Sequence, residues 1–221
     1  MRALPCVLVI GCGGQAAAPQ KQPADDPPPA GTVAGKVALG DAPAVHLAGR
    51  AVPLERLPMT DLIGLPMSGL ADFTIDIDVP PRDYSKATGT AAFSCAPCRL
   101  GADGTTLANG IVVGHIELDR VEARAEIGDG RARLVAWQLA SKELAIDLVL
   151  ELELRPALAD AVVTGCLRYR VLPPLAQRDP GIGSLITLAG GTVGDDGMAS
   201  LVMSGKLSAV RLAAGACSTK R

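Results

Sequence analysis

The chain has 221 residues, of which 48% are apolar, so it is long enough to bury a core, and we expect one folded domain. Its formal net charge of -2 provides no long-range field that would attract phosphate backbones or anionic lipid head groups. Aromatic residues make up only 2% of the chain, which argues against nucleic-acid binding by base stacking. We therefore expect no nucleic-acid partner.

Segment 1–12 is typical of a short export signal. One arginine precedes an apolar run that is too short to span a bilayer, which needs ~20 apolar residues. The run ends in Val9-Ile10-Gly11-Cys12, which is similar to the lipobox of bacterial lipoproteins, and this similarity predicts lipidation of Cys12. The alternative is a truncated or misplaced start at Met1, because export signals normally have ~15–30 residues.

Residues 13–35 have the composition of a tether. They are mostly alanine, proline, glutamine, glycine and aspartate, with Asp26-Pro27-Pro28-Pro29 at their centre. Such a segment buries too little apolar surface to order itself. We expect a disordered tether there, a single β-rich domain over residues 36–212 and a disordered tail over 213–221.

Apolar and polar residues alternate repeatedly within the expected domain, as they do in strands with one buried face. The pattern is clearest in segments 72–79, 121–127, 144–155, 163–171 and 199–207. Each of these segments is therefore expected to form a strand.

Turn residues separate the expected strands. Gly128-Asp129-Gly130 predicts a tight hairpin between 121–127 and 131–139. Ile116 and Leu118 have the opposite parity to Val121, which predicts a register change near Asp119-Arg120.

Segment 144–155 gives the longest strand signal, about 40 Å at ~3.3 Å per residue. Its acidic face suits the basic face of 163–171, so we expect these two strands to pair. Strands in a compact sandwich are usually shorter. The expected fold is therefore mainly β: an elongated, twisted and curved antiparallel sheet, with one short helix near the C-terminal end, within 175–190.

Four cysteines lie outside the signal-like segment, namely Cys95, Cys98, Cys166 and Cys217, and their even number is consistent with an oxidising compartment. We expect a disulfide between Cys95 and Cys98. A redox site would need a helix N-terminus to lower the pKa of the first thiol. A zinc site would need a second close pair of ligands. We expect neither, and no cofactor.

The remaining ionisable and glycine-rich residues suggest no catalytic site. His46 and His115 are the only histidines, which argues against a histidine-based triad. The carboxylates follow the strand period, as expected for solvated strand faces: Asp72, Asp76, Asp78, Asp147, Glu151 and Glu153. Gly181-Ile182-Gly183 and Gly190-Gly191 lack the lysine and helix context of phosphate loops. We therefore expect that the protein is not an enzyme.

A series of short motifs resembles the type II secretion system protein N family, in the form found in deltaproteobacteria and related bacteria. The resemblance covers roughly residues 47–210 and depends on the order and spacing of the motifs. They are Val52-Pro53-Leu54-Glu55-Arg56-Leu57-Pro58, Gly64-Leu65-Pro66-Met67-Ser68-Gly69, Lys86-Ala87-Thr88-Gly89-Thr90, Cys95-Ala96-Pro97-Cys98-Arg99-Leu100-Gly101, Ile116-Glu117-Leu118, Gly128-Asp129-Gly130, Asp179-Pro180, Leu188-Ala189-Gly190-Gly191 and Ser204-Gly205-Lys206-Leu207-Ser208.

The resemblance implies a non-enzymatic accessory of the envelope-spanning machine that exports folded proteins, with the β-domain in the periplasm. It implies other envelope components of that system as partners. Family members usually begin with a transmembrane helix and a further β-rich segment, and this chain has only the signal-like segment and the tether there. Attachment to a membrane is therefore expected at the N-terminus, through Cys12 or through a shortened anchor.

Two functions follow from this reasoning. The first is a structural component of type II secretion that acts through protein–protein contacts of its sheet. The alternative is an envelope module for lipid binding or lipid transfer, in which a curved sheet holds a lipid ligand in an apolar groove. The aliphatic side of 144–154 is compatible with both, because it can be either a closed core or the lining of such a groove.

Overall fold

The computed structural model describes residues 30–40, 42–57, 65–106, 112–181 and 191–217. Cys12 lies outside these ranges, so its lipidation stays a prediction. The strands are β1 (Thr32–Ala38), β2 (Ala44–Pro53), β3 (Met67–Asp78), β4 (Thr88–Leu100), β5 (Thr105–Thr106), β6 (Val112–Val113), β7 (Ile116–Leu118), β8 (Arg120–Gly128), β9 (Arg131–Ala140), β10 (Leu144–Glu153), β11 (Val162–Val171), β12 (Thr192–Val193), β13 (Ala199–Lys206) and β14 (Arg211–Ala214). The helical elements include α2 (Pro173–Arg178) and the 3-10 turns η1 (Leu54–Arg56), η2 (Tyr84–Lys86), η3 (Leu158–Asp160) and η4 (Leu207–Ala209).

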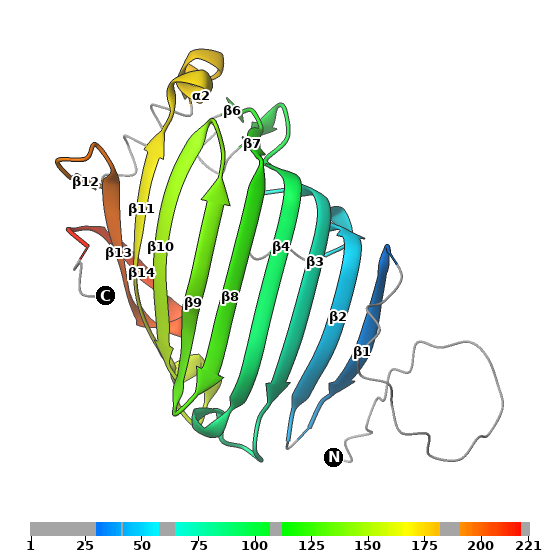
Figure 1. Ribbon diagram of the computed structural model, residues 1–221. Coiled ribbons are helices and arrows are strands. Elements are labelled where there is room, and N and C mark those ends of the chain that lie inside the picture. The colour runs from blue at the N-terminus through cyan, green and yellow to red at the C-terminus, as the bar shows by residue number, and fades with distance from the viewer. Residues whose placement is uncertain (1–29, 41, 58–64, 107–111, 182–190, 218–221) are drawn as a thin grey trace.

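Twelve of the strands in the described part of the chain form one antiparallel sheet in the order β1-β2-β3-β4-β8-β9-β10-β11-β13-β12 (Figure 1). β7 continues the sheet beside β4, and β14 pairs with β13. Strands that follow one another in the sequence are mostly hydrogen-bonded neighbours, so the chain runs up and down across the sheet. The predicted fold class is confirmed.

Two pairings expected from the sequence are confirmed. β8 and β9 form a hairpin in which Asp129 and Gly130 have φ angles of 51° and 73°, as a tight turn with left-handed residues requires. β10 pairs with β11 over its whole length, and this register places Asp147 opposite Arg168. The alternation of apolar and polar residues in these strands therefore predicted correctly which side chains share a face.

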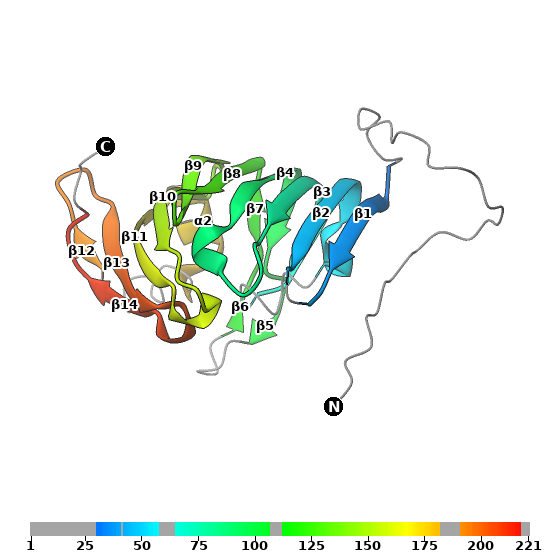
Figure 2. The ribbon, with the colours of Figure 1, turned by 90° about the horizontal axis from the view of Figure 1, so that it is seen from below.

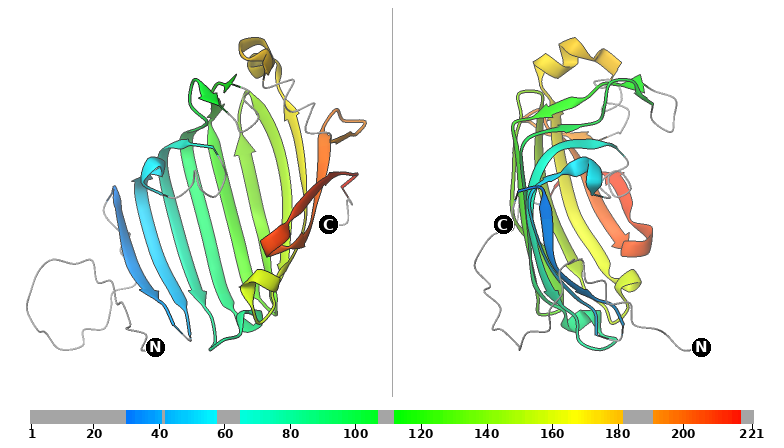
Figure 3. Two further views of the ribbon diagram at one scale, coloured as in Figure 1. Left: turned by 180° about the vertical axis from the view of Figure 1, so that it is seen from behind. Right: turned by 90° about the vertical axis from the view of Figure 1, so that its right-hand side faces the viewer.

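The sheet is bent into an arch when it is seen along its strands, with β8 and β9 at the crown (Figure 2). The elements η1, η4 and the β5–β6 hairpin lie on the inner side of this arch (Figure 3, right). The side chain of Leu54 in η1 is buried in the same cluster as Ala71 and Cys95 of the sheet. The face of the sheet that carries these apolar residues is therefore the inner face.

The register shift near Asp119 takes a different form from a simple bulge. Cys95 lies opposite Val121, and Cys98 lies opposite Leu118, so both strands change parity over the same three-residue step. Because the change is shared, all four side chains are buried on the inner face. One-sided shifts occur between β2 and β3, β3 and β4, and β8 and β9.

The sheet extends beyond the expected limits of the domain at both ends. β1 begins at Thr32, inside the expected tether, and β14 ends at Ala214, inside the expected tail. Short segments can gain order by pairing with a strand already in place, and composition alone does not report this. The helix α2 begins at Pro173, earlier than expected, while residues 182–190 of the expected helical stretch lie outside the described residues.

Candidate functional site

The inner face of the arch is apolar at every sheet position in its long strands. Along β10, the inner side chains are Leu144, Ile146, Leu148, Leu150 and Leu152, and β11 continues the face in register with valine, glycine, leucine and tyrosine. The equivalent positions of β2, β3, β4, β8, β9 and β13 carry only alanine, valine, leucine, isoleucine, methionine, glycine, cysteine, phenylalanine and tryptophan. One entire side of the sheet therefore lacks charged side chains.

The two ends of this face are covered by buried clusters. The α2 cluster contains Leu54, Met67, Ala71, Cys95, Cys98, Ile116, Leu118, Val121, Leu144 and Leu175. The η2 cluster, at the opposite end of the strands, contains Val79, Ala87 and Leu154. Turn elements close both ends, because their side chains pack onto the last residues of the strands.

Between the two clusters lies a central patch that no described element covers. Its residues are half-buried and belong to neither cluster: Val45, Leu47, Ile75, Ala91, Ala123, Ala125, Leu134, Leu148, Leu150, Leu167 and Met203. A sheet with one apolar face normally buries that face against a second layer. Figure 3 (left) shows the sheet from behind, where its strands form a single layer over most of its width.

Trp137 lies at the edge of the central patch. It is opposite Ala123 on β8, and its indole N–H donates to the carbonyl oxygen of Ile146 on β10 at 3.1 Å. This hydrogen bond satisfies the polar atom of the ring and fixes the ring on the inner face. Because Trp137 is the only tryptophan of the chain, its fluorescence reports on the surroundings of this one ring.

The α2 end is held by a partly buried ion pair. The Glu143 side chain, 9% exposed, accepts hydrogen bonds from the Glu117 backbone N–H at 2.7 Å and from Arg178 Nη2 at 3.0 Å. Arg178 also donates to the carbonyl oxygen of His115. These contacts join α2 to β7 and to the start of β10. They give this end of the sheet a fixed geometry.

The outer face carries the charged side chains of the strands, and several of them pair across strands. Glu151 of β10 binds Arg131 and Arg133 of β9 at 3.1 and 3.0 Å, and Arg168 of β11 binds Asp147 at 3.4 Å. A broad open hollow of ≈ 1280 Å³ lies over β4, β8–β11 and β13, and its lining includes Asp147, Glu151 and Arg168 of this face together with Trp137 and Leu148. These charged side chains in its lining are already paired with groups of opposite charge, so their charges are largely compensated.

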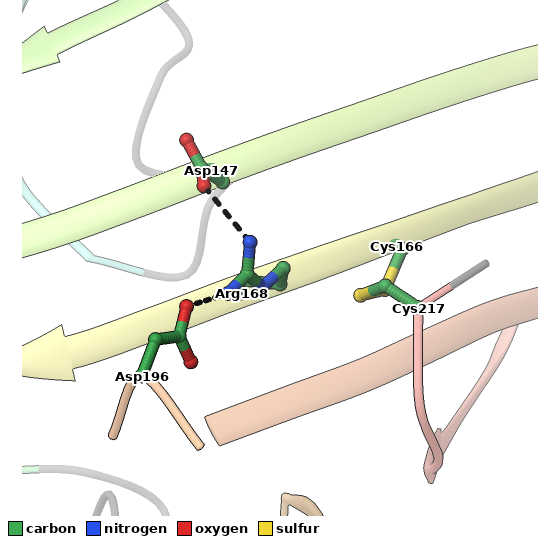
Figure 4. Close-up of a disulfide and its surroundings, with 5 residues drawn as sticks. All are labelled: Asp147, Cys166, Arg168, Asp196 and Cys217. Atoms are coloured by element: carbon green, nitrogen blue, oxygen red, sulfur yellow. Dashed lines mark hydrogen bonds and ion pairs between the residues drawn. A yellow bond between two sulfur atoms is a disulfide. The ribbon is translucent and has the colours of Figure 1, made fainter. Parts of the chain in front are cut away.

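The end of the described chain reaches this outer face at Ala216 and Cys217. Cys217 forms a disulfide with Cys166 of β11, with a Cα–Cα distance of 5.7 Å (Figure 4). Close to it, Asp196 contacts Arg168 and receives a hydrogen bond from the Met198 backbone N–H at 3.2 Å. That backbone N–H, together with Arg168, lowers the pKa of Asp196. The disulfide fastens the end of the described chain to β11, and the Asp196–Arg168 contact fastens the connection between β12 and β13 to the same strand.

The expected disulfide between Cys95 and Cys98 is wrong in this structure, where both are buried free thiols. Cys98 Sγ donates to the Cys95 carbonyl oxygen at 3.5 Å. Each thiol also affects the other: the neighbouring Cys98 and burial raise the pKa of Cys95, while the hydrogen bond from Cys95 lowers that of Cys98. The close spacing of Cys95 and Cys98 suggested that they pair, but the disulfide of the structure joins Cys166 to Cys217, 51 residues further along the chain.

Strand register brings His46 together with two of the carboxylates. His46 Nδ1 is 2.6 Å from Asp76, and its Nε2 is 3.3 Å from Asp78. All three residues are exposed, as the strand period predicted for the two aspartates. The parity of β2 and β3 was readable in the sequence, but their register was not, so the sequence could not place His46 in this group.

His115 also lies between two carboxylates. Its Nδ1 is 2.7 Å from Asp103, and its Nε2 is 3.1 Å from Glu117. The hydrogen bond from His115 lowers the pKa of Asp103. Both histidines thus have each ring nitrogen close to a carboxylate.

β1 forms one edge of the sheet. All seven of its residues are exposed, and its one neighbouring strand in the described part of the chain is β2. Val33 and Val37 continue the inner apolar face and are 48% and 42% exposed. An edge strand of this length that lacks proline is a site where another strand can add to the sheet.

No family model, curated protein or solved structure matches this chain. The helices found in the described ranges are all too short or too polar to cross a lipid bilayer.

Proposed function

We propose that this protein is a non-enzymatic accessory of a type II protein secretion system, located on the periplasmic side of the bacterial envelope. In this role its sheet binds another envelope component of the system through strand addition. The family resemblance in residues 47–210 suggests the system, and the exposed edge strand β1 is the observation that carries the mode of action.

The edge strand supports binding through the backbone. An extended segment of a partner, aligned with β1, would gain main-chain hydrogen bonds along seven residues. Its alternate side chains would meet Val33 and Val37 on one side, which gives the contact an apolar component. Strand addition therefore requires no rearrangement of the sheet.

The disulfide supports a periplasmic location. Bonds such as Cys166–Cys217 persist in oxidising compartments, which include the bacterial periplasm. The N-terminal signal-like segment points to the same compartment. Attachment to the membrane at Cys12 is part of this proposal.

The ion pairs of the outer face support binding over catalysis. Arg168 and Glu151 each contact two oppositely charged groups, and His46 lies between two carboxylates, so these side chains are occupied by structural contacts. The proposal accordingly assigns no catalytic residue and no cofactor.

A photo-crosslinking experiment in the native bacterium tests the proposal. A benzophenone amino acid replaces Val37 on the edge strand, and the matched control carries it at Val149, an exposed valine on the outer face of β10. We expect the Val37 variant alone to crosslink to an identified component of the secretion machine. We also expect a deletion strain to retain in its periplasm the folded proteins that the parent releases into the medium.

The proposal fails if the deletion strain releases the same proteins in the same amounts. The hypothesis of strand addition at β1 is tested separately. It is wrong if deletion abolishes secretion but crosslinks to the secretion machine form at Val149 and not at Val37.

A further inference from the structure

We propose that the central patch on the inner face binds the acyl chains of a lipid. This site is distinct from the edge strand β1 and does not depend on the proposed role in secretion. The occupant is a hydrocarbon chain that lies along the strands, in contact with β8, β9, β10 and β11.

The chemistry of the patch selects hydrocarbon over peptide. Its side chains offer no hydrogen-bonding group, and the backbones of β8 and β11 are paired with both neighbouring strands, while β9 and β10 pair with each other over Arg131–Arg133 and Glu151–Glu153. An extended peptide laid on this surface would bury N–H and C=O groups without partners, which costs free energy for each group. A hydrocarbon chain has no such groups and gains from leaving water.

The length of the patch suits an acyl chain. On β8 the α2 cluster ends at Val121, and the η2 cluster begins at Ile127, a separation of about 20 Å at ~3.3 Å per residue. One acyl chain spans roughly half of the ~30 Å hydrocarbon core of a bilayer. A single chain therefore fits between the two clusters along the strand direction.

The curvature of the sheet argues against a second copy of this protein as the occupant. Two arches that face each other meet at their rims and leave their crowns, β8 and β9, apart (Figure 2). Protein interfaces and cores are stable when they are close-packed, and this arrangement leaves the centre unfilled. Flexible hydrocarbon chains can fill a curved apolar surface without a matching shape.

Trp137 provides the test, because it is the only tryptophan and lies on the inner face beside the patch. The full-length protein, freed of co-purified lipid, is titrated with dibromostearate, and unbrominated stearate serves as the control. Bromine atoms quench an indole that they touch. We expect a saturable loss of Trp137 fluorescence with dibromostearate and no loss with stearate.

Two aspartate variants on one strand locate the site. Leu148→Asp places a charge in the central patch, and Val149→Asp places the same charge on the opposite face of β10, at a side chain that is 67% exposed. We expect Leu148→Asp to weaken binding by about tenfold or more, because a carboxylate beside hydrocarbon loses hydration. The Val149→Asp variant should bind as the parent does.

Three results would overturn the proposal. The first is the absence of saturable quenching in the parent protein, and the second is equal weakening of binding by both variants. The third is a dimer of the lipid-free protein that Leu148→Asp dissociates and Val149→Asp does not, because a second copy would then occupy the patch. The quenching of the parent protein stands as a result even if Leu148→Asp fails to fold.

Discussion

Leu144 and Leu148 allow a direct test of where the sheet is covered. Both project from the inner face of β10, and their neighbours on β11 are Val171 and Leu167. Leu144 is only 5% exposed and belongs to the α2 cluster, whereas Leu148 is half-buried in the central patch. Alanine at each position therefore removes the same atoms from two different environments.

The expected costs differ by about 2 kcal/mol. Leu144→Ala should lower the free energy of unfolding by about 3 kcal/mol, because it leaves a cavity inside a closed cluster. Leu148→Ala should lower it by only about 1 kcal/mol, because burial of a leucine is worth ~1.5–3 kcal/mol when complete and no cavity forms at an open surface. Urea denaturation followed by Trp137 fluorescence measures both values. Equal costs at the two positions would refute the reading that the central patch is uncovered.

Three further predictions concern the contacts that hold the sheet. Glu143→Ala should lower the free energy of unfolding by about 2–3 kcal/mol, because it removes charged hydrogen bonds at a mostly buried site. Glu151→Ala on the outer face should lower it by only ~0–1 kcal/mol. Urea denaturation of both variants compares the two values, and similar values would contradict a structural role for the Glu143 ion pair. Cys217→Ser should lower the free energy of unfolding by up to about 4 kcal/mol, since it opens a loop that spans 51 residues. If this variant and the parent have equal melting temperatures under oxidising conditions, the disulfide is not present. The backbone N–H of Met198 lowers the pKa of Asp196, so this contact stabilises the fold above the unfolded pKa of 3.8, and its contribution is lost as the pH falls through the lower folded pKa. The amide chemical shift of Met198 should therefore titrate with a midpoint below 3.8. A midpoint at or above 3.8 would contradict the contact.

Much of the fold could be predicted because strand parity is a local property. The alternation in 144–155 and 163–171 identified two strands, their inner faces and their pairing, and the structure confirms the pairing over ten positions. The Gly128-Asp129-Gly130 turn identified the β8–β9 hairpin, because only a few residue types accept its backbone geometry. Each of these features depends on residues that are close together in the chain.

The cysteines and histidines were harder to place because their contacts join distant segments. Cys95 and Cys98 were close in sequence, but the disulfide joins Cys166 to Cys217, which depends on the route of the chain after β14. His46 meets Asp76 because β2 and β3 align in one particular register. Parity restricts register to steps of two residues but does not choose among them.

The sequence by itself determined that this chain forms a long antiparallel sheet with one apolar and one polar face, because side chains alternate along a strand with a period of two. It left open whether the aliphatic side of 144–154 is a closed core or an exposed surface. The tertiary structure of the described residues shows the division: buried clusters close the two ends, and the half-buried residues of the central patch between them belong to neither cluster. The physical reason is that alternation specifies which side chains share a face, whereas the covering of that face depends on where distant turns and helices are placed by the whole fold.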